Sequence, residues 1–323
     1  MESLNYKAGY IYSNVIEKRL DDSSFTMNQD LQKAYIENSK LYFDSKDGFR
    51  QSLKEGMFML RIPGFIDIAE CDLFAQNFYK GPSSQQYNFE NYREAYAKFR
   101  EYTCQLFDDS LLGFHERVDQ IEQFLLEKRF WDEWYPNPIK EVAYQLCSIS
   151  TLIVRTILQA IDIAPRDYDI ATGGCASSKG SYHLTFNHYR PSILTKGLSS
   201  HKDDGFTTIL RTVSPGLEVN RYDKWERVNV DKDYFIINFG LAMEILTKKS
   251  SCPVSAIMHR VSQQKNDRWS WGHFSSSQCV SEYDQGIYEF TIENGLRRIC
   301  DSRQLINNND HEIYFGTKNS GTM

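Results

Sequence analysis

Three side chains of metal-binding type occur at a spacing that could bring them to one point. One residue separates His201 from Asp203, so in an extended segment both side chains point the same way. His259 lies inside another strand-like segment, Ile257–Val261. Two histidines and one carboxylate on one face are typical of an Fe(II) site that keeps coordination positions open. The pattern alone is weak, because two surface polar residues and one core histidine would look the same.

Two further pairs at i and i+2 add to this interpretation. Arg268 and Ser270 would share one face of a strand, and Asn187 and Tyr189 would share a face of another. An arginine can form a bidentate pair with a carboxylate, and a serine hydroxyl adds a donor. A dicarboxylate held between a metal and an arginine needs such a set. Taken singly, each pair could equally be a surface ion pair or a tyrosine packed in the core.

The elements that would position these residues change in character near residue 165. Before it, apolar spacing indicates helices over 29–44, 67–79 and 138–162, the last with Asn137 as N-cap, and a strand at 57–62. After it, short segments rich in β-branched and aromatic residues alternate with turns, which favours antiparallel strands in a sandwich or barrel. The predicted strands are 182–189, 206–212, 217–222, 225–230, 234–239, 256–263 and 268–276.

Residues 184–276 resemble the C-terminal half of the 2-oxoglutarate/Fe(II)-dependent oxygenases of the isopenicillin-N-synthase-like group. The resemblance is carried, in family order, by 187–191, 197–203, 207–210, 215–219, 225–228, 238–240, 244–247, 255–261 and 268–270. It implies an α+β fold: a double-stranded β-helix (jelly roll) core flanked by α-helices. We expect one composite domain over 1–323, with a mainly helical part at 1–165, the jelly-roll core at 166–280 and a C-terminal extension at 281–323.

The resemblance also implies a site. His201, Asp203 and His259 would bind Fe(II), and Arg268 and Ser270 would hold the distal carboxylate of 2-oxoglutarate. Asn187 and Tyr189 would contact this cosubstrate near the metal. The implied reaction consumes 2-oxoglutarate and O2, releases succinate and CO2, and oxidises a C–H bond of a small molecule by hydroxylation, desaturation or ring closure.

Departures from the family pattern bear on the substrate. Leu241 follows Gly240 where the family has aspartate, Lys202 separates His201 from Asp203, and Arg190 interrupts a Tyr-Pro pair. A local group of cations predicts a carboxylated, amino-acid-like or specialised metabolite. One version is kainoid-type cyclisation of an N-prenylated acidic amino acid, although these charges could also be solvated strand ends. The predicted substrate residues are His188, Arg190, Lys196 and Lys202.

Other classes of function stay open at this point. A cosubstrate-free Fe(II) oxidase of the isopenicillin-N-synthase kind could use the Arg-x-Ser pair for its own substrate. A non-catalytic jelly-roll ligand-binding protein would be expected to lack a ligand or the arginine. A zinc hydrolase with two histidines and one aspartate would not need the Arg268 and Tyr189 segments in order.

The composition limits the classes of binding partner and the compartment that we expect. The net charge of −6 argues against a nucleic-acid binder, which needs a basic face. No run approaches 18 apolar residues, so we expect no membrane span. The seven cysteines are scattered and contain no Cys-x-x-Cys, which favours free thiols in a reducing compartment. We therefore expect a cytoplasmic monomer that acts on a small molecule.

Overall fold

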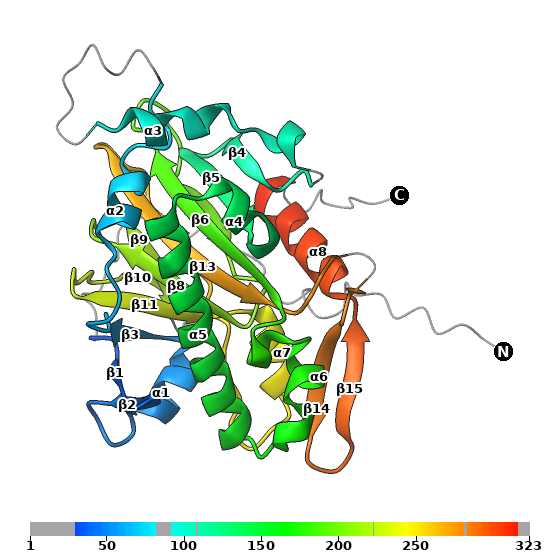
Figure 1. Ribbon diagram of the computed structural model, residues 1–323. Coiled ribbons are helices and arrows are strands. Elements are labelled where there is room, and N and C mark those ends of the chain that lie inside the picture. Colours follow the sequence, from blue (N-terminus) through cyan, green and yellow to red (C-terminus); the bar gives the residue numbers. More distant parts are fainter. Residues whose placement is uncertain (1–29, 82–91, 108, 222, 281–282, 316–323) are drawn as a thin grey trace, which may run out of the picture.

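The computed structural model describes residues 30–81, 92–107, 109–221, 223–280 and 283–315. Its largest feature is a nine-stranded sheet with the order β2-β1-β3-β11-β8-β13-β6-β5-β4 (Figure 1). Within it β1 pairs parallel with β3, and the other neighbours pair antiparallel. The strands are β1 (Lys33–Glu37), β2 (Lys40–Phe43), β3 (Met57–Arg61), β4 (Gly113–Glu116), β5 (Ile121–Glu127), β6 (Ser181–Tyr189), β8 (Thr207–Thr212), β11 (Tyr234–Phe239) and β13 (Arg268–Ser276).

A second, four-stranded sheet completes the core in the order β10-β9-β12-β7. Its strands are β7 (Leu198–His201), β9 (Leu217–Arg221), β10 (Lys224–Arg227) and β12 (His259–Val261). From β6 to β13 the chain passes back and forth between the two sheets, so that β6, β8, β11 and β13 lie in the large sheet and β7, β9, β10 and β12 in the small one. This is the path of a double-stranded β-helix, and the predicted jelly roll is confirmed.

The helix α5 (Asn137–Ala160) packs across the outer face of the large sheet against β8 and β13 (Figure 1). It buries the apolar stripe that the sequence predicts, and it begins at Asn137 with Pro136 in the N-cap position. By length and composition α5 could also cross a membrane, but 56% of its most apolar window is buried inside the protein. The stripe includes Ile139, Val142, Leu146, Ile149, Ile153 and Ile157.

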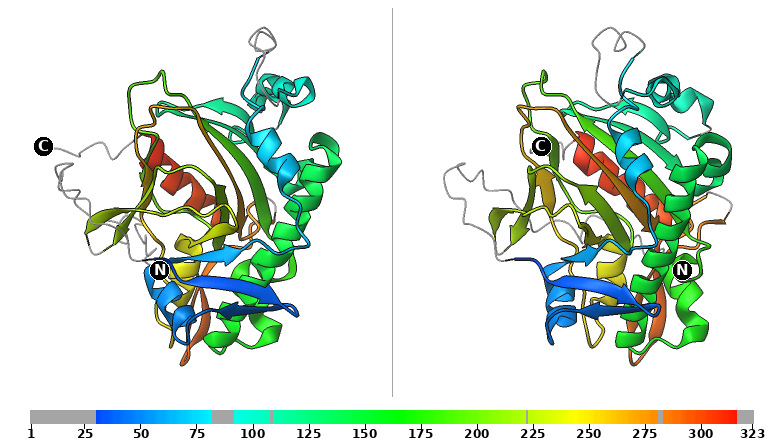
Figure 2. Two further views of the ribbon diagram at one scale, coloured as in Figure 1. Left: turned by 90° about the vertical axis from the view of Figure 1, so that its left-hand side faces the viewer. Right: turned by 60° about the vertical axis from the view of Figure 1, so that its left-hand side comes forward.

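The other helices are short and surround the sheets. In chain order they are α1 (Gly48–Glu55), α2 (Ala69–Ala75), α3 (Glu94–Ala97), α4 (Trp131–Trp134), α6 (Tyr168–Thr172), α7 (Leu241–Thr247) and α8 (Ser302–Phe315). Single 3-10 turns occur at 98–101, 104–106, 128–130, 165–167 and 175–177. Two of the helices lie near the site. The helix α7 follows β11 directly in the chain, and Figure 2 shows α8 between strands of the two sheets.

The N-terminal part is less helical than the sequence predicts. Residues 33–43, expected within a helix, form the β1–β2 hairpin, with Asn38 and Ser39 in the left-handed conformation at its turn. The hairpin exists because β1 extends the large sheet beside β3, a partner that local apolar spacing does not show. With β3, β4 and β5 also present, the described residues of 1–165 combine five strands with the helices, of which α5 is the longest element, and the description of this part as mainly helical stays a prediction.

One hydrophobic cluster joins the parts of the chain. It includes Ala34 from β1, the buried face of α5, and Leu305 from α8. The C-terminal extension adds the hairpin of β14 (Ile287–Thr291) and β15 (Gly295–Cys300) before α8. This shared cluster supports a single composite domain, which stays a prediction; residues 1–29 and 316–323 lie outside the described residues. All seven cysteines are free of disulfides, as predicted.

Candidate active site

The structure brings the three predicted metal ligands together. The last residue of β7, His201, is the register partner of the first residue of β12, His259. Asp203 follows in the turn after β7, and its Oδ1 lies 3.8 Å from Nε2 of His201 and 3.6 Å from Nε2 of His259. One ligand atom from each residue lies within 4.8 Å of the other two. Antiparallel pairing of two strands distant in sequence therefore creates the cluster.

Hydrogen bonds prepare both histidines to bind a metal through Nε2. Nδ1 of His201 lies 2.8 Å from the carbonyl oxygen of Ser199, and Nδ1 of His259 lies 3.2 Å from that of Ile257. A carbonyl can only accept, so each Nδ1 carries the proton and each Nε2 presents its lone pair. The hydroxyl of Thr208 donates to Oδ2 of Asp203 at 2.6 Å, leaving Oδ1 toward the histidines.

The protonation state also suits metal binding. Burial, followed by the neighbouring His259, lowers the pKa of His201 to about 4, against the opposing effect of Asp203. A neutral imidazole is the form that ligates a metal. The donor set of two imidazoles and one carboxylate matches Fe(II) with open positions.

Arg268 lies at another part of the same cavity and is 2% exposed. Its Nε donates to the carbonyl oxygen of Pro215 at 3.1 Å, and its Nη2 donates to the hydroxyl of Thr212 at 3.0 Å. The ring of Tyr189 lies 4.4 Å from the guanidinium carbon. Nη1 is buried and has no hydrogen-bond partner among the described residues. An unpaired buried cationic donor is costly, so this end of the cavity fits a carboxylate.

The cavity has a volume of about 190 Å³ and lies between the two sheets. The predicted cosubstrate residues Asn187, Tyr189, Arg268 and Ser270 line it together with the three metal-binding residues. The register explains why, because Tyr189 pairs with Arg268 and Asn187 pairs with Ser270 in adjacent strands. The site thus combines a candidate metal-binding cluster with an end whose unpaired guanidinium nitrogen fits a carboxylate.

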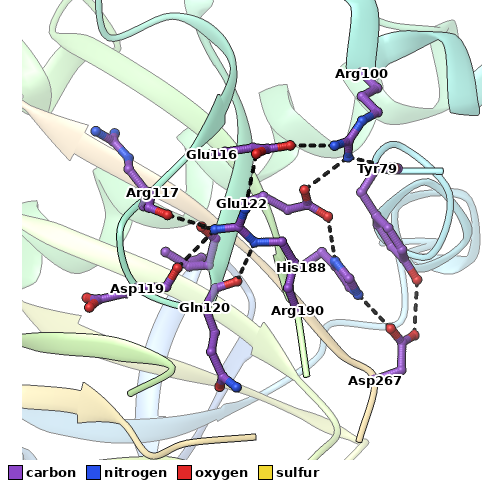
Figure 3. A network of polar contacts seen from close by, with 11 residues as sticks. Tyr79, Arg100, Glu116, Arg117, Asp119, Gln120, Glu122, His188, Arg190 and Asp267 are labelled. Carbon is purple, nitrogen blue, oxygen red and sulfur yellow. Dashed lines mark hydrogen bonds and ion pairs between the residues drawn. The ribbon is translucent and has the colours of Figure 1, made fainter. Parts of the chain in front are cut away.

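Three of the four predicted substrate residues lie elsewhere. His188 points to the opposite face of β6, where its ring nitrogens contact Glu122 at 2.7 Å and Asp267 at 2.5 Å (Figure 3). Arg190 donates to the backbone carbonyls of residues 117, 119, 120 and 121 (Figure 3). Lys196 is exposed and does not line the cavity. Predicting these three as substrate contacts is wrong, because alternation and pairing direct them away from the cavity.

Lys202 does line the cavity, but Glu244 of α7 neutralises it. Its Nζ lies 3.1 Å from each carboxylate oxygen of Glu244. Glu244 also accepts a 2.7 Å bond from the amide of Ala256. The carboxylate thereby connects the His201–Asp203 turn with the segment that leads into His259, so it braces the metal cluster from outside.

The His188 contacts predict a pH-dependent contribution to stability. Burial lowers the pKa of His188, but hydrogen bonds to Asp267 and Glu122 outweigh it, and the net pKa is raised. Such a group stabilises the fold fully below its unfolded pKa of about 6.5, and this contribution disappears as pH rises through the folded value. We expect His188→Gln to lower the free energy of unfolding by about 2 kcal/mol at pH 6.

The measurement is urea unfolding of both proteins at pH 6 and pH 8.5. The loss caused by His188→Gln should shrink at the higher pH, because the histidine is then less charged in the wild type. The matched control is His115→Gln: burial lowers the pKa of His115, so the same pH-dependent loss should not appear. A loss for His188→Gln that is equal at both pH values would contradict the assignment.

Part of the cavity wall comes from outside the β-helix, and its residues were not predicted from the sequence. Gln123 and Leu125 of β5, Leu111, and Ile306 and Asn309 of α8 line the cavity. On β6 the alternation that predicts Asn187 and Tyr189 extends to His183 and Thr185, and this signal was available. No such signal was available for the residues of β5 and α8, because their segments match no motif.

Comparisons with known proteins agree with this geometry. Residues 181–277 match the model of the 2OG-Fe(II) oxygenase superfamily. The chain is similar to protein DMR6-LIKE OXYGENASE 1 of Arabidopsis thaliana, with 25% identity over 226 residues that cover 67% of this chain and 62% of the relative. It is also similar to 1-aminocyclopropane-1-carboxylate oxidase of Dendrobium crumenatum, with 25% identity over 57% of this chain and 63% of the relative. The chain thus spans less than two thirds of these relatives' length.

A solved structure supports the fold. JOX2, crystallised in complex with 2OG, Fe and JA, superposes with a TM-score of 0.62 at 18% identity, covering 92% of this chain and 90% of JOX2. The likeness extends beyond the matched segment to the flanking helices and strands.

Proposed function

Residues 181–277 of this chain form a 2OG-Fe(II) oxygenase superfamily domain, and from this premise we propose that the protein is an Fe(II)- and 2-oxoglutarate-dependent dioxygenase. The observation that carries the proposal is one cavity with two complementary ends. His201, Asp203 and His259 cluster at one, and the unpaired Nη1 of Arg268 lies at the other.

Each residue of the site has a role in this proposal. The three clustered ligands would hold Fe(II), which, with 2-oxoglutarate and O2, supplies the oxidation of a C–H bond. Arg268 and Ser270 bind the distal carboxylate of the cosubstrate, and Tyr189 packs on the guanidinium to orient it. The sheets exclude water from the cosubstrate end, since Arg268 and Ser270 are 2% and 1% exposed.

We propose a small carboxylated, amino-acid-like or specialised metabolite as the substrate. With His188, Arg190 and Lys196 outside the cavity, Arg117 of the β4–β5 turn supports this class, because it lines the wall beside Leu111 and Leu125. Hydroxylation, desaturation and ring closure, including kainoid-type cyclisation of an N-prenylated acidic amino acid, share the same metal and cosubstrate residues. The outcome depends on which C–H bond lies nearest the metal cluster.

The proposed setting follows the same reasoning. Unpaired thiols at all seven cysteines support a reducing compartment, and we propose a cytoplasmic monomer. The net charge of −6 supports the proposal that nucleic acid is not a partner. The burial of α5 against the sheet supports a protein that acts without inserting into a membrane.

The test is anaerobic addition of Fe(II) and then 2-oxoglutarate to the purified protein. We expect a weak visible charge-transfer band that needs both additions, followed by succinate release when O2 and carboxylated amines are supplied. A product formed without 2-oxoglutarate would instead indicate a cosubstrate-free oxidase. Tight zinc binding with no band at all would refute the proposal.

A further inference from the structure

Three polar side chains form a row across adjacent strands in the wall of the cavity. Gln123 of β5 is the register partner of Asn187 of β6, and Asn187 is the register partner of Ser270 of β13. Directly opposed residues on one face of a sheet have Cβ atoms about 5 Å apart, close enough for short polar side chains to touch. All three line the cavity.

Hydrogen bonds connect this row to Arg117. Nε of Arg117 donates to Oε1 of Gln123 at 3.1 Å. Nε2 of Gln123 donates to Oδ1 of Asn187 at 2.9 Å, and Nδ2 of Asn187 donates to Oγ of Ser270 at 3.3 Å. This series of hydrogen bonds therefore runs from the β4–β5 turn to the end of the cavity that holds Arg268 and Ser270.

Arg117 determines which way the hydrogen bonds of this series point, from donor to acceptor. A guanidinium has donors and no acceptor, so Gln123 must turn its oxygen toward Arg117 and its amino group toward Asn187. Asn187 must then offer its oxygen to Gln123 and its amino group to Ser270. Neither amide can reverse without facing donor against donor.

These hydrogen bonds determine how the hydroxyl of Ser270 is oriented. Its oxygen is occupied by the amino group of Asn187, and among the described residues the hydroxyl donates to no side chain or backbone atom. The residue is 1% exposed, so bulk water does not take the proton. The hydroxyl hydrogen is left to point into the cavity, on the strand that also carries Arg268.

We propose that Gln123 is a positioning residue that, with Arg117 and Asn187, fixes the Ser270 hydroxyl as a donor to the distal carboxylate of 2-oxoglutarate. This inference rests on the proposed function. It assigns to β5, which lies outside the matched segment 181–277, a part in cosubstrate binding. Gln123 does not itself touch the carboxylate and acts through Asn187 and Ser270.

The decisive variant is Gln123→Glu, which keeps the shape of the side chain and its contact with Arg117. A carboxylate has no donor, so Asn187 must turn its amino group toward β5 and its oxygen toward Ser270. The Ser270 hydroxyl then donates to Asn187 and is lost to the cosubstrate. We expect the Kd for the cosubstrate to rise about tenfold or more, as for loss of one hydrogen bond to a charged group.

The readout is titration of 2-oxoglutarate into the anaerobic Fe(II) protein, followed by the charge-transfer band. Added negative charge near a dianion could weaken binding by itself, so Gln123→Glu is also made in a Ser270→Ala protein. If Gln123 acts through the hydroxyl, Ser270→Ala alone raises the Kd, and adding Gln123→Glu raises it no further.

Two results would overturn the inference. One is an unchanged Kd for Gln123→Glu in the wild-type background. The other is an equal rise of the Kd in the Ser270→Ala background, which would show a general charge effect. A wild-type protein that gives no band with Fe(II) and 2-oxoglutarate would refute the proposed function itself, and is recognised before any variant is made. Thermal melting of each variant checks that the fold is retained.

Discussion

The His259→Ala protein is expected to lose the Fe(II)–2-oxoglutarate charge-transfer band and to release succinate about a thousandfold more slowly or not at all. The reason is the number of donors: without His259, only His201 and Asp203 remain of the three clustered ligands. Two donors cannot hold the metal in the facial arrangement that leaves the opposite positions open. The measurement is metal content after gel filtration, followed by the band and by succinate release.

A second histidine variant shows whether the effect belongs to the site. His115 lies on β4 and does not line the cavity, so His115→Gln should keep both the band and the turnover. His259 is 7% exposed, so truncating it leaves a small void as well as a missing ligand. Thermal melting therefore accompanies the assay. Retention of the band in a folded His259→Ala protein would rule out the assigned metal cluster.

The second large effect is expected at Arg268. Arg268→Ala should weaken cosubstrate binding about a hundredfold, in both the dissociation constant and the Michaelis constant, because it removes a buried cation that faces the carboxylate end. Fe(II) binding in the absence of cosubstrate should be unchanged, since Arg268 contacts none of the clustered ligands directly. Titration of the charge-transfer band and the dependence of succinate release on cosubstrate concentration measure the two constants.

Arg268→Lys separates charge from geometry. Lysine keeps the positive charge but cannot reproduce the bonds that Nε and Nη2 make to Pro215 and Thr212. We expect a Kd between those of the wild type and Arg268→Ala. Thr212→Ala is the matched control, because it removes a contact of the guanidinium and keeps the charge. Equal affinity of all three variants and the wild type would exclude Arg268 from cosubstrate binding.

Strand alternation allowed much of the site to be predicted from sequence. The i, i+2 rule placed His201 with Asp203 and Arg268 with Ser270, and the cavity wall contains all four. Pairing between strands was harder to predict from the sequence. The strand β7 was not predicted, and the predicted strand at 256–263 is shorter in the structure, where it covers His259–Val261. Their register, which opposes His201 and His259, depends on contacts between distant segments that no local pattern encodes.

Three of the four residues predicted to form a cationic pocket, His188, Arg190 and Lys196, do not line the cavity. Residue types and positions in the chain do not show which charges are already paired. The alternation that puts Asn187 and Tyr189 in the cavity also puts His188 on the other face, where Glu122 and Asp267 hold it. Lys202 does line the cavity, but its partner Glu244 lies on the helix α7, which no pattern in the sequence predicted.

The helix α8 supplies part of the cavity wall and also contacts the turn that carries Asp203. Asn309 donates to the carbonyl oxygen of Lys202 and to Asp204, and Ile306 lines the same cavity. This wall lies beyond the family segment, which ends at residue 277, whereas Arg268 and Ser270 lie inside it. Ile306 belongs to α8 and not to the strand that carries Arg268 and Ser270, so its substitution changes this wall and leaves that strand intact. Loss of Asn309, by contrast, also removes two bonds to the turn that holds Asp203. A match confined to 181–277 therefore describes the end of the cavity that holds Arg268 and leaves the wall formed by α8 undescribed.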